Sequence, residues 1–476
     1  MASSRLTRLA AVISSNTEKL NRYITSHNLP CPSFDVHAPA DFPIVTDDPE
    51  IQKARSDLIL ATAELHDLVV GPTEQMRWLA WSHNNSLSLR AMYNFKIANS
   101  FPIDAEASYA EIASATGVDE VNVRRLIRHA MTNHIFKESR PGYVAHTIQS
   151  RLLAESGKMQ DWVGFCVEDM WPAAQKTVDA MRKHPASQEP SEAGFPAAFN
   201  CKQPMFMEIG KDPKRAKRFG GAMNSLTGGV GYEVDYLANN YPWDKLKNGT
   251  VVDLGGSHGF VSVALAKKYP QLKFVVQDLP KTVVDGPSKI PPDLSTRVTF
   301  MAHDFFAEQP VHGADVYLFR WILHNWSDKY SLQILRSLIP ALKPGARIVI
   351  NDGVLPEPNT DSAWDEKITR TMDLVMLTLL NAQERTVSEW KSLFERADPR
   401  YKFLGASHPD GCRMWIIEAR WDGEKETEKT QPPTNVDDDD DTVQIQVQVP
   451  QLQLQNQENN KKQKVPLTNM TEKGRL

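Results

Sequence analysis

The sequence predicts an α/β protein in which a mostly parallel, doubly wound sheet follows an α-helical, winged-helix-like region. Two observations lead to this fold class. After Trp243, short runs rich in Val, Ile and Phe alternate with helical segments, which is typical of a parallel sheet covered by helices on both faces. Before Trp243 the pattern is mostly helical, with one short hairpin-like stretch.

The size and composition of the chain indicate a globular protein of more than one domain. Its 476 residues exceed the roughly 250 to 300 at which a single core stops growing. No apolar run approaches the ~20 residues that a membrane span needs. The net charge of −5 gives no electrostatic reason to expect nucleic acid. We therefore expect neither a nucleic acid nor a membrane as a partner.

The cysteines favour a reducing compartment. Cys31, Cys166, Cys201 and Cys412 are widely scattered and form no CxxC pair, so they indicate neither a zinc site nor a disulfide framework. We expect a cytoplasmic protein that holds no metal.

Residues 1–75 predict an N-terminal helical segment. Two helical patterns, "SSNTEKLNRYITSH" and "EIQKARSDLILATAELHDLVVG", are separated by the proline-rich "NLPCPSFDVHAPADFP". The opening "MASSRLTRLAAVISS" is basic and serine-rich like a transit peptide, but its apolar core is short and it lacks a clear small-residue cleavage site. An ordinary surface helix is favoured there.

Residues 76–155 predict a winged-helix-like domain. A helix, a turn at Gly117, a second helix and a short hairpin follow one another in this stretch. DNA binding would use Arg124, Arg125 and Arg128 on the second helix. The alternative, that the domain packs against another protomer, is favoured because the chain is acidic and has no other basic cluster.

Residues 156–240 predict a helical connector that contributes to the substrate pocket, residues 241–422 the sheet domain, and residues 423–476 a disordered tail. The tail is charged and glutamine-rich, so it buries too little apolar surface to offset its ordering entropy. The predicted strands of the sheet domain lie in "GTVVDLGG", "KFVVQDLP", "RVTFMAHDFF", "ADVYLFRWIL" and "ARIVINDGVLP".

A glycine-rich turn after the first of these strands predicts a ligand site. "VVDLGGSHGF" places Asp253, Gly255, Gly256 and Gly259 between a buried strand and a helix, where the turn can tighten and a ligand can approach the backbone. A turn of this kind sometimes serves packing only. When it does bind a ligand, the pattern alone does not choose between a dinucleotide and another adenosyl cofactor.

The next two strands end in residues that suit an adenosyl group. Asp278 ends "VVQD", where a carboxylate can accept hydrogen bonds from both ribose hydroxyls. Asp304, in "HDFF", could accept from an adenine amino group, and Phe305 could cover the ring. Matched features at successive strand ends strengthen the prediction of a cofactor site.

Several stretches together resemble the class I S-adenosylmethionine-dependent O-methyltransferases. They are "VVDLGGSHG", "FVVQDLP", "LFRWILHNWSD", "LKPGARIVINDGVLP" and "MDLVMLTLLNAQERT", and they are most similar to the plant and fungal small-molecule (caffeate/flavonoid-type) family, in particular its fungal polyketide branch. The resemblance extends to about Trp421. It implies a Rossmann-like methyltransferase domain that binds S-adenosylmethionine, preceded by a winged-helix dimerisation domain in a homodimer. It adds Leu279 and Arg320 to the expected cofactor contacts.

The same resemblance implies a catalytic histidine. His324 follows the fourth strand, at the sheet edge where ligands bind in open α/β folds. A lone histidine is more often bonded within the core, but Asp352 and Glu384 occupy the positions whose acids flank the catalytic histidine in the family. One of them would fix the ring through a ring nitrogen and raise its basicity.

A histidine base suits a phenol as the methyl acceptor. A phenol is about 3.5 pKa units less acidic than imidazolium, so complete proton transfer costs on the order of 5 kcal/mol. A sulfonium charge ~4 Å from the forming phenolate offsets roughly 4 kcal/mol at an effective dielectric near 20. The predicted function is therefore methyl transfer to a phenolic hydroxyl of a small aromatic secondary metabolite, an aromatic polyketide being favoured, and no divalent metal is expected.

The substrate pocket is predicted from aromatic and methionine residues. Flat aromatic molecules suit such walls, because thioethers fill irregular gaps and contact ring edges. Stripes of this kind are more often core, so we expect about half of six candidates to contact substrate. The six are Trp162, Phe165, Met205, Phe206, Met372 and Met376.

Four positions depart from the plant pattern of the family. Ser257 replaces a glycine in the turn, as in the fungal branch, so cofactor binding is expected to survive. Asn325, expected near the substrate, replaces a common aspartate and lacks its charge. Asp352 is one methylene shorter than the usual glutamate, so its hydrogen bond to the imidazole would need a backbone shift or a water. Arg320 stands where a lysine is frequent.

Two other functions are weighed against methyl transfer. A catalytically silent, methyltransferase-like regulator acting through its winged helix is disfavoured by the intact histidine and both acids. A nicotinamide-dependent oxidoreductase would explain the glycine turn, but it gives no role to "HDFF" and "ERT".

Overall fold

The computed structural model of the protein describes residues 4–44, 48–358 and 362–423. Within these ranges, no helix is long and apolar enough to cross a membrane. The predicted tail from residue 423 onward lies outside the described residues, apart from Gly423 itself.

The chain begins with helices that pack through apolar side chains. α1 starts after Ser4, whose hydroxyl accepts a hydrogen bond from the Thr7 N–H at 3.2 Å, so the stretch compared with a transit peptide is helical here. α2 ends at Gly71, which has a left-handed φ of +80°. The helices are α1 (Arg5–Ser26), α2 (Pro49–Val70) and α3 (Pro72–Trp81).

A small antiparallel sheet and several helices occupy the segment expected to be winged-helix-like. α5 ends at Gly117 in a left-handed turn, α6 follows, and β2 and β3 form the hairpin. Of the basic residues on α6, Arg128 pairs with Glu138 at 2.9 Å, so it is not an isolated cation. The elements are α4 (His83–Asn94), η1 (Ile97–Asn99), β1 (Glu106–Ser108), α5 (Tyr109–Thr116), α6 (Glu120–Met131), β2 (Lys137–Arg140), β3 (Tyr143–Ala145) and α7 (Ile148–Glu155), with the strand order β1-β3-β2. DNA binding and dimerisation by this segment stay predictions.

Helices connect this segment to the large sheet. A single π-helical turn interrupts them, and its Asp169 is buried and paired with Arg215 and Arg218 of α12 at 2.6 and 2.7 Å. The elements are α8 (Gly157–Phe165), η2 (Cys166–Met170), α9 (Trp171–Lys183), η3 (Pro190–Glu192), α10 (Gly194–Phe199), α11 (Met205–Ile209), α12 (Pro213–Thr227), α13 (Val234–Asn240) and η4 (Trp243–Leu246).

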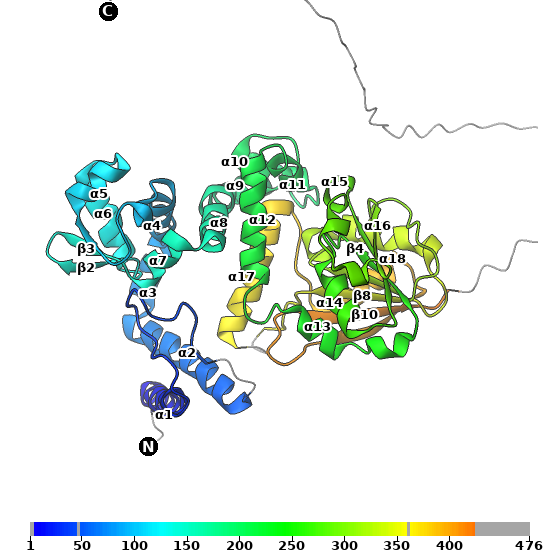
Figure 1. The fold of residues 1–476 in the computed structure, drawn as a ribbon, viewed down its shortest axis with the longest axis horizontal. Helices are drawn as coiled ribbons and strands as arrows, with labels where there is room; N and C mark the ends of the chain where they lie inside the picture. Colours follow the sequence, from blue (N-terminus) through cyan, green and yellow to red (C-terminus); the bar gives the residue numbers. More distant parts are fainter. Residues whose placement is uncertain (1–3, 45–47, 359–361, 424–476) are drawn as a thin grey trace, which may run out of the picture. The chain divides into compact units, whose positions relative to one another are not determined.

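The large sheet has seven strands in the order β6-β5-β4-β7-β8-β10-β9. Figure 1 labels β4, β8 and β10 of this sheet. The first five are parallel and coincide with the five predicted strands, and β10 and β9 are antiparallel additions at one edge. The strands are β4 (Thr250–Leu254), β5 (Lys273–Asp278), β6 (Val298–Ala302), β7 (Val316–Arg320), β8 (Arg347–Asp352), β9 (Tyr401–Ser407) and β10 (Trp415–Trp421).

Helices cover both faces of this sheet. Side chains alternate along each strand, so each strand presents apolar residues to both faces. On β7, Tyr317 and Phe319 join the apolar core under α16 and α18, whereas Val316 and Leu318 join the core under α13 and α14. The elements between the strands are α14 (Phe260–Lys268), α15 (Pro280–Val283), η5 (Gly286–Ser288), η6 (Pro292–Leu294), η7 (Leu323–Asn325), α16 (Asp328–Leu338), η8 (Ile339–Ala341), α17 (Ala363–Leu380) and α18 (Val387–Ala397).

The carboxyl ends of β4, β5, β6, β7 and β8 meet at one edge of the sheet. The β9–β10 hairpin turns at this same edge, because Trp415 pairs with Asp352 at the end of β8 and Ile416 pairs with Ser407. The hairpin loop, residues 408–414, therefore lies beside the residues that follow β8. The expected ligand-binding edge thus gains a wall that the sequence did not predict.

Candidate functional site

His324 is buried and held by an acid from a distant part of the chain. It lies in the 3₁₀-helix η7, just after β7, and its Nδ1 is 2.8 Å from Oε1 of Glu384, which follows α17. The two side chains are only 6% and 3% exposed. A carboxylate accepts hydrogen bonds, so this contact favours a proton on Nδ1. The other nitrogen, Nε2, bonds to no described residue and is left as the acceptor.

Asp352 holds the backbone of the histidine and not its ring. Its Oδ2 accepts a hydrogen bond from the His324 main-chain N–H at 3.2 Å. The sequence predicts that one of the two acids fixes the ring, and Glu384 is the one that bonds to it directly. The shorter Asp352, at the end of β8, makes no direct bond to the imidazole and fixes the turn.

Burial and nearby charges have opposing effects on the pKa values of His324 and Asp352. Burial by itself would lower the pKa of His324, but the charge and hydrogen bond of Glu384, with the charge of Asp352, outweigh it and raise the pKa. Burial raises the pKa of Asp352 to about 6, against the attraction of His324. The imidazole is therefore a stronger base than a free histidine.

Two carboxylate oxygens of Glu384 and Asp352 bond to no described residue. Oε2 of Glu384 and Oδ1 of Asp352 are both buried without a hydrogen-bond partner. The Glu384 backbone is fixed, because its N–H donates to Oδ1 of Asp373 at 2.9 Å. A Cβ at Gly353 would lie 3.0 Å from Oε2, so this glycine leaves room for the carboxylate. Buried polar atoms are usually hydrogen-bonded, so these two oxygens can accept a hydrogen bond from a ligand or a water molecule.

Arg385, next to Glu384, clamps the turn that carries His324. Its guanidinium is fully buried and donates to the main-chain oxygens of Leu323 and Trp326 at 3.2 and 2.8 Å. It also pairs with Asp328 at the start of α16. The "ERT" stretch therefore supplies both the acid on the ring and the cation under the turn.

Trp321 has an unusual backbone at this turn. Its φ is +58°, in the left-handed region that bulky residues rarely adopt, and its ring centroid lies 4.9 Å from that of His324. The Trp321 N–H donates to the carbonyl of Asn351 at 3.2 Å. The strained residue brings an aromatic ring to the side of the base.

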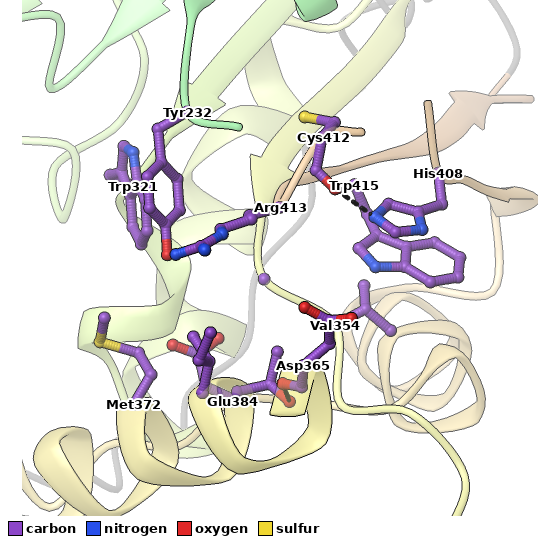
Figure 2. A pocket seen from close by; sticks show the side chains of 13 residues that line it. Tyr232, Trp321, Val354, Asp365, Met372, Glu384, His408, Cys412, Arg413 and Trp415 are labelled. Carbon is purple, nitrogen blue, oxygen red and sulfur yellow. Dashed lines mark hydrogen bonds between the residues drawn. The ribbon is translucent and has the colours of Figure 1, made fainter. Parts of the chain in front are cut away.

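A cavity opens beside Glu384 and Trp321, which line it, whereas His324 and Asp352 are not among its lining residues (Figure 2). The β9–β10 hairpin forms one wall, where His408 stacks on Trp415 with centroids 4.6 Å apart and an angle of 6° between the rings. Nε2 of His408 lies 2.6 Å from the carbonyl oxygen of Cys412, which fixes the loop. The lining residues are Tyr232, Trp321, Gly353, Val354, Asp365, Ile368, Thr369, Met372, Glu384, His408, Cys412, Arg413 and Trp415.

Of the six predicted apolar pocket residues, the structure brings Met372 to this cavity. The others lie in or beside a separate core between the connecting helices and α17. Phe165, Met205 and Met376 are buried there, Trp162 packs against it, and Phe206 is 40% exposed. Asn325 donates to the main-chain oxygen of Trp321 at 2.9 Å and does not line the cavity. One of the six residues therefore lines this cavity, whereas about half of them are expected from the sequence to contact substrate.

The glycine turn after β4 is built for close approach. Gly255 has a φ of +71°, and a Cβ there would lie 2.4 Å from a side-chain carbon of Ile322. Ser257 adopts a φ of +53°, so serine takes the left-handed conformation in which glycine is more common. The Ser257 N–H donates to Oδ2 of Asp278 at 2.9 Å, and the Leu279 N–H donates to Oδ1 at 2.7 Å. The carboxylate thus ties the turn to the end of β5.

Asp253 lies below this turn and not on its surface. It is 1% exposed, and its Oδ2 accepts a hydrogen bond from the Ser262 hydroxyl at 2.7 Å. A Cβ at Gly256 would lie 2.7 Å from the Asp253 carboxylate. Burial raises the pKa of Asp253 to about 6, and the nearby charge of Asp278 adds to this. Asp253 is placed to shape the loop.

The residues after β6 and at the end of β7 complete this edge. Asp304 is exposed and its Oδ1 accepts a hydrogen bond from the Phe306 N–H at 3.0 Å. Phe305 is half-buried, and a Cβ at Gly255 would lie 3.8 Å from its ring. Arg320 is buried; it donates to the side chain of Asn351 and, at 2.5 Å, to the carbonyl of Tyr232. Arg320 thus joins β8 to the pocket wall, and its charge also acts on Asp253 below the glycine turn.

Comparison with known proteins identifies the family. The family described as O-methyltransferase domain matches residues 180–398. Chlorophenol O-methyltransferase of Trichoderma longibrachiatum is 49% identical over 427 residues, which cover 88% of this chain and 91% of that protein. A grayanic acid biosynthesis cluster O-methyltransferase of Cladonia grayi is 41% identical, with 89% and 90% coverage. The chain belongs to this O-methyltransferase family.

Solved structures agree with the fold. The crystal structure of OxaC matches with a TM-score of 0.69 and 22% identity, covering 87% of this chain and 98% of that one. LepI in complex with SAM matches with a TM-score of 0.63 and 20% identity, covering 87% and 99%. These likenesses show the fold, with its Rossmann-like domain. Membership of the O-methyltransferase family makes the protein an S-adenosylmethionine-dependent O-methyltransferase. The predicted family, fold class and cofactor are confirmed.

The methyltransferase's residues fit its cofactor. The glycines leave the backbone open to a ligand, and Asp278 has a half-exposed carboxylate that can accept further hydrogen bonds. Sequence reasoning missed the hairpin residues His408, Arg413 and Trp415. A signal was available, since "YKFLGAS" and "MWIIEARW" are strand-like runs around the turn sequence "HPDG".

Proposed function

We propose that this methyltransferase acts on a phenolic hydroxyl of a small aromatic secondary metabolite, with His324 as the general base. The observation that carries the proposal is the buried contact of 2.8 Å between Nδ1 of His324 and Oε1 of Glu384. It leaves Nε2 to take the phenolic proton, and the two residues that contact the ring, Glu384 and Trp321, line a cavity with aromatic walls.

The chain's own residues account for activation of the phenol. Glu384 and Asp352 stabilise the imidazolium that forms when Nε2 accepts the proton, which is why the pKa of His324 is raised despite its burial. The raised pKa narrows the gap of about 3.5 units between a free histidine and a phenol. When bound, S-adenosylmethionine supplies an activated methyl group. Asp278, the glycine turn and Phe305 are proposed to hold it, with Asp304 toward the adenine.

The relatives support a phenolic acceptor and a biosynthetic role. One acts, by its name, on chlorophenol, and another belongs to a grayanic acid biosynthesis cluster. A chlorophenol carries its hydroxyl directly on an aromatic ring, as the proposal requires. A polyketide phenol is the acceptor we favour, since the sequence resembles the fungal polyketide branch.

The proposal is tested with His324→Gln. We expect methyl transfer from labelled S-adenosylmethionine to a panel of phenols to fall by about 10²- to 10⁴-fold, the usual contribution of a general base. The calorimetric affinity for S-adenosylhomocysteine should stay within about twofold of wild type, because His324 is not in the cofactor loop. Near wild-type turnover by the variant would refute the base assignment.

We also propose a homodimer in which α3 contacts a second copy. α3 has no buried residue, and its Met76, Trp78, Leu79 and Trp81 are 61 to 66% exposed. Apolar surface of this extent is typical of an interface. Sedimentation should give a dimer for the wild type and a monomer for Trp78→Glu/Trp81→Glu. A monomeric wild type would refute this proposal.

A further inference from the structure

The cavity that Glu384 and Trp321 line has one positively charged side chain in its wall. Among its described lining residues, Arg413 is the one arginine and there is no lysine. Figure 2 shows its side chain extending toward Tyr232, on the side of the cavity opposite Glu384 and Met372. The guanidinium carbon lies 5.5 Å from the centroid of the Tyr232 ring. The guanidinium therefore interacts with the aromatic face of Tyr232 at the cavity wall.

The structure holds Arg413 in place at its stem. Its main-chain N–H donates to the carbonyl of Gly231 at 2.8 Å. Gly231 has a φ of +91°, and a Cβ there would lie 2.9 Å from Cγ of Arg413. A glycine is thus required for the stem to pass. Arg413 is an exposed residue, so these contacts restrict the start of its side chain and leave the guanidinium accessible.

No described acid neutralises this guanidinium: no ion pair or side-chain hydrogen bond of Arg413 occurs among residues 4–44, 48–358 and 362–423. The two acids that line the cavity have other partners. Glu384 binds the ring of His324, and Asp365 accepts a hydrogen bond from the Ser362 hydroxyl at 2.6 Å. The charge of Arg413 is available to a ligand.

A second arginine lies close enough for the positive charge of Arg413 to act on it. Arg55 of α2 is stacked over Phe42 at 4.6 Å. Burial lowers the pKa of Arg55, and the positive charge of Arg413 lowers it further, against the opposing charge of Asp41. Like charges brought together disfavour one another, and an anion between or beside them relieves the repulsion.

We propose that Arg413 determines specificity by binding a carboxylate on the substrate, so that the preferred acceptors are phenolic acids. The planar guanidinium matches a carboxylate with two parallel hydrogen bonds. The stacked rings of His408 and Trp415, beside Arg413 on the hairpin, give a flat wall for the aromatic ring that carries both groups. This inference rests on the proposed phenolic methyl transfer and narrows its substrate class.

The test compares a phenolic acid with its own ester. 2,4-Dihydroxybenzoic acid and its methyl ester are titrated calorimetrically into the full chain saturated with S-adenosylhomocysteine. The acid should bind roughly tenfold more tightly than the ester, the scale of one charge-assisted hydrogen-bonded pair. Arg413→Gln should abolish this preference and Arg413→Lys should keep part of it. Arg420→Gln, whose side chain pairs with Asp422 on the same hairpin, is the control and should keep all of it.

The outcomes separate this inference from the proposed function. Equal or weaker binding of the acid by the wild type, including no binding at all, overturns the role of Arg413. The same holds if Arg413→Gln, with an unchanged melting temperature, still prefers the acid. Methyl transfer is measured separately with labelled cofactor on the acid, on the ester and on neutral phenols. If none of these is methylated while the acid is still bound through Arg413, the proposed phenolic transfer fails and the anion site stands.

Discussion

The two halves of the ligand edge of the sheet are built differently. At the ends of β4 and β5, the cofactor half is a short glycine turn tied to the partly exposed Asp278 by main-chain hydrogen bonds. Beyond β7 and β8, the catalytic half brings His324 and Glu384 together across 60 residues of sequence and buries both. The cofactor half thus depends on local backbone conformation, and the catalytic half depends on buried charged groups.

This difference tells what each half is sensitive to. In the catalytic half, removing a charge alters the basicity of a buried group, so rate and pH dependence should respond. In the cofactor half, a change of side chain alters backbone geometry or a partly solvated hydrogen bond, so affinity should respond. The substitutions below, from the largest expected effect to the smallest, test whether the two halves separate in this way.

Glu384→Gln should have the largest effect. The amide can still accept from Nδ1 of His324, but the negative charge that raises the pKa is gone, so we expect kcat to fall by about 10²-fold. The base must be neutral to act, so activity is lost as pH falls through the pKa of His324. In the variant this acid limb should move to lower pH, as kcat/KM against pH will measure. An acid limb at the wild-type position would contradict the role of Glu384.

Gly255→Ala should destabilise the cofactor half. A Cβ would collide with Ile322 and the residue would have to keep a φ of +71°, so we expect a loss of about 2 kcal/mol in the free energy of unfolding, with weaker binding of S-adenosylhomocysteine. Urea denaturation and calorimetry measure both. Gly345→Ala, at φ +83° with open space around it, is the matched control for backbone strain without a collision. Equal losses from the two variants would show that Ile322 is not the cause.

Asp278→Asn should weaken the affinity for the cofactor by roughly tenfold, with little change in the dependence of kcat/KM on pH. The amide can accept only part of what the carboxylate accepts from Ser257, Leu279 and a ribose. Calorimetry with S-adenosylhomocysteine gives the affinity. A shift of the acid limb in this variant would mean that the two halves are coupled, and the contrast between them would fail.

Ser257→Gly should have the smallest effect. Glycine removes the strain of a left-handed serine, which stabilises the fold by on the order of 1 kcal/mol. It also raises the conformational entropy of the unfolded chain, which destabilises the fold by a similar free energy. The Ser257 N–H that donates to Asp278 is unchanged. We expect the affinity for S-adenosylhomocysteine to change by less than about twofold, in calorimetry at one temperature.

The contrast also explains what the sequence could predict. The five parallel strands and the residues of the glycine turn follow from local patterns, because strand periodicity and turn chemistry are properties of short segments. The partner of the His324 ring does not follow, because the reach of Glu384 and Asp352 depends on how β8 and α17 end. The pocket was predicted from apolar residues, although Phe165 and Met205 serve the core. Burial alone does not distinguish a wall from a core.

The β9–β10 hairpin has a consequence for how such an enzyme diversifies. Its loop, residues 408–414, is a surface connection between two antiparallel strands at the edge of the sheet, and it carries His408 and Arg413 into the cavity. Loops of this kind tolerate exchange of side chains and of length better than the strands they join. New acceptors can therefore be gained by replacing a few residues in one loop, while the base and the cofactor turn are inherited unchanged.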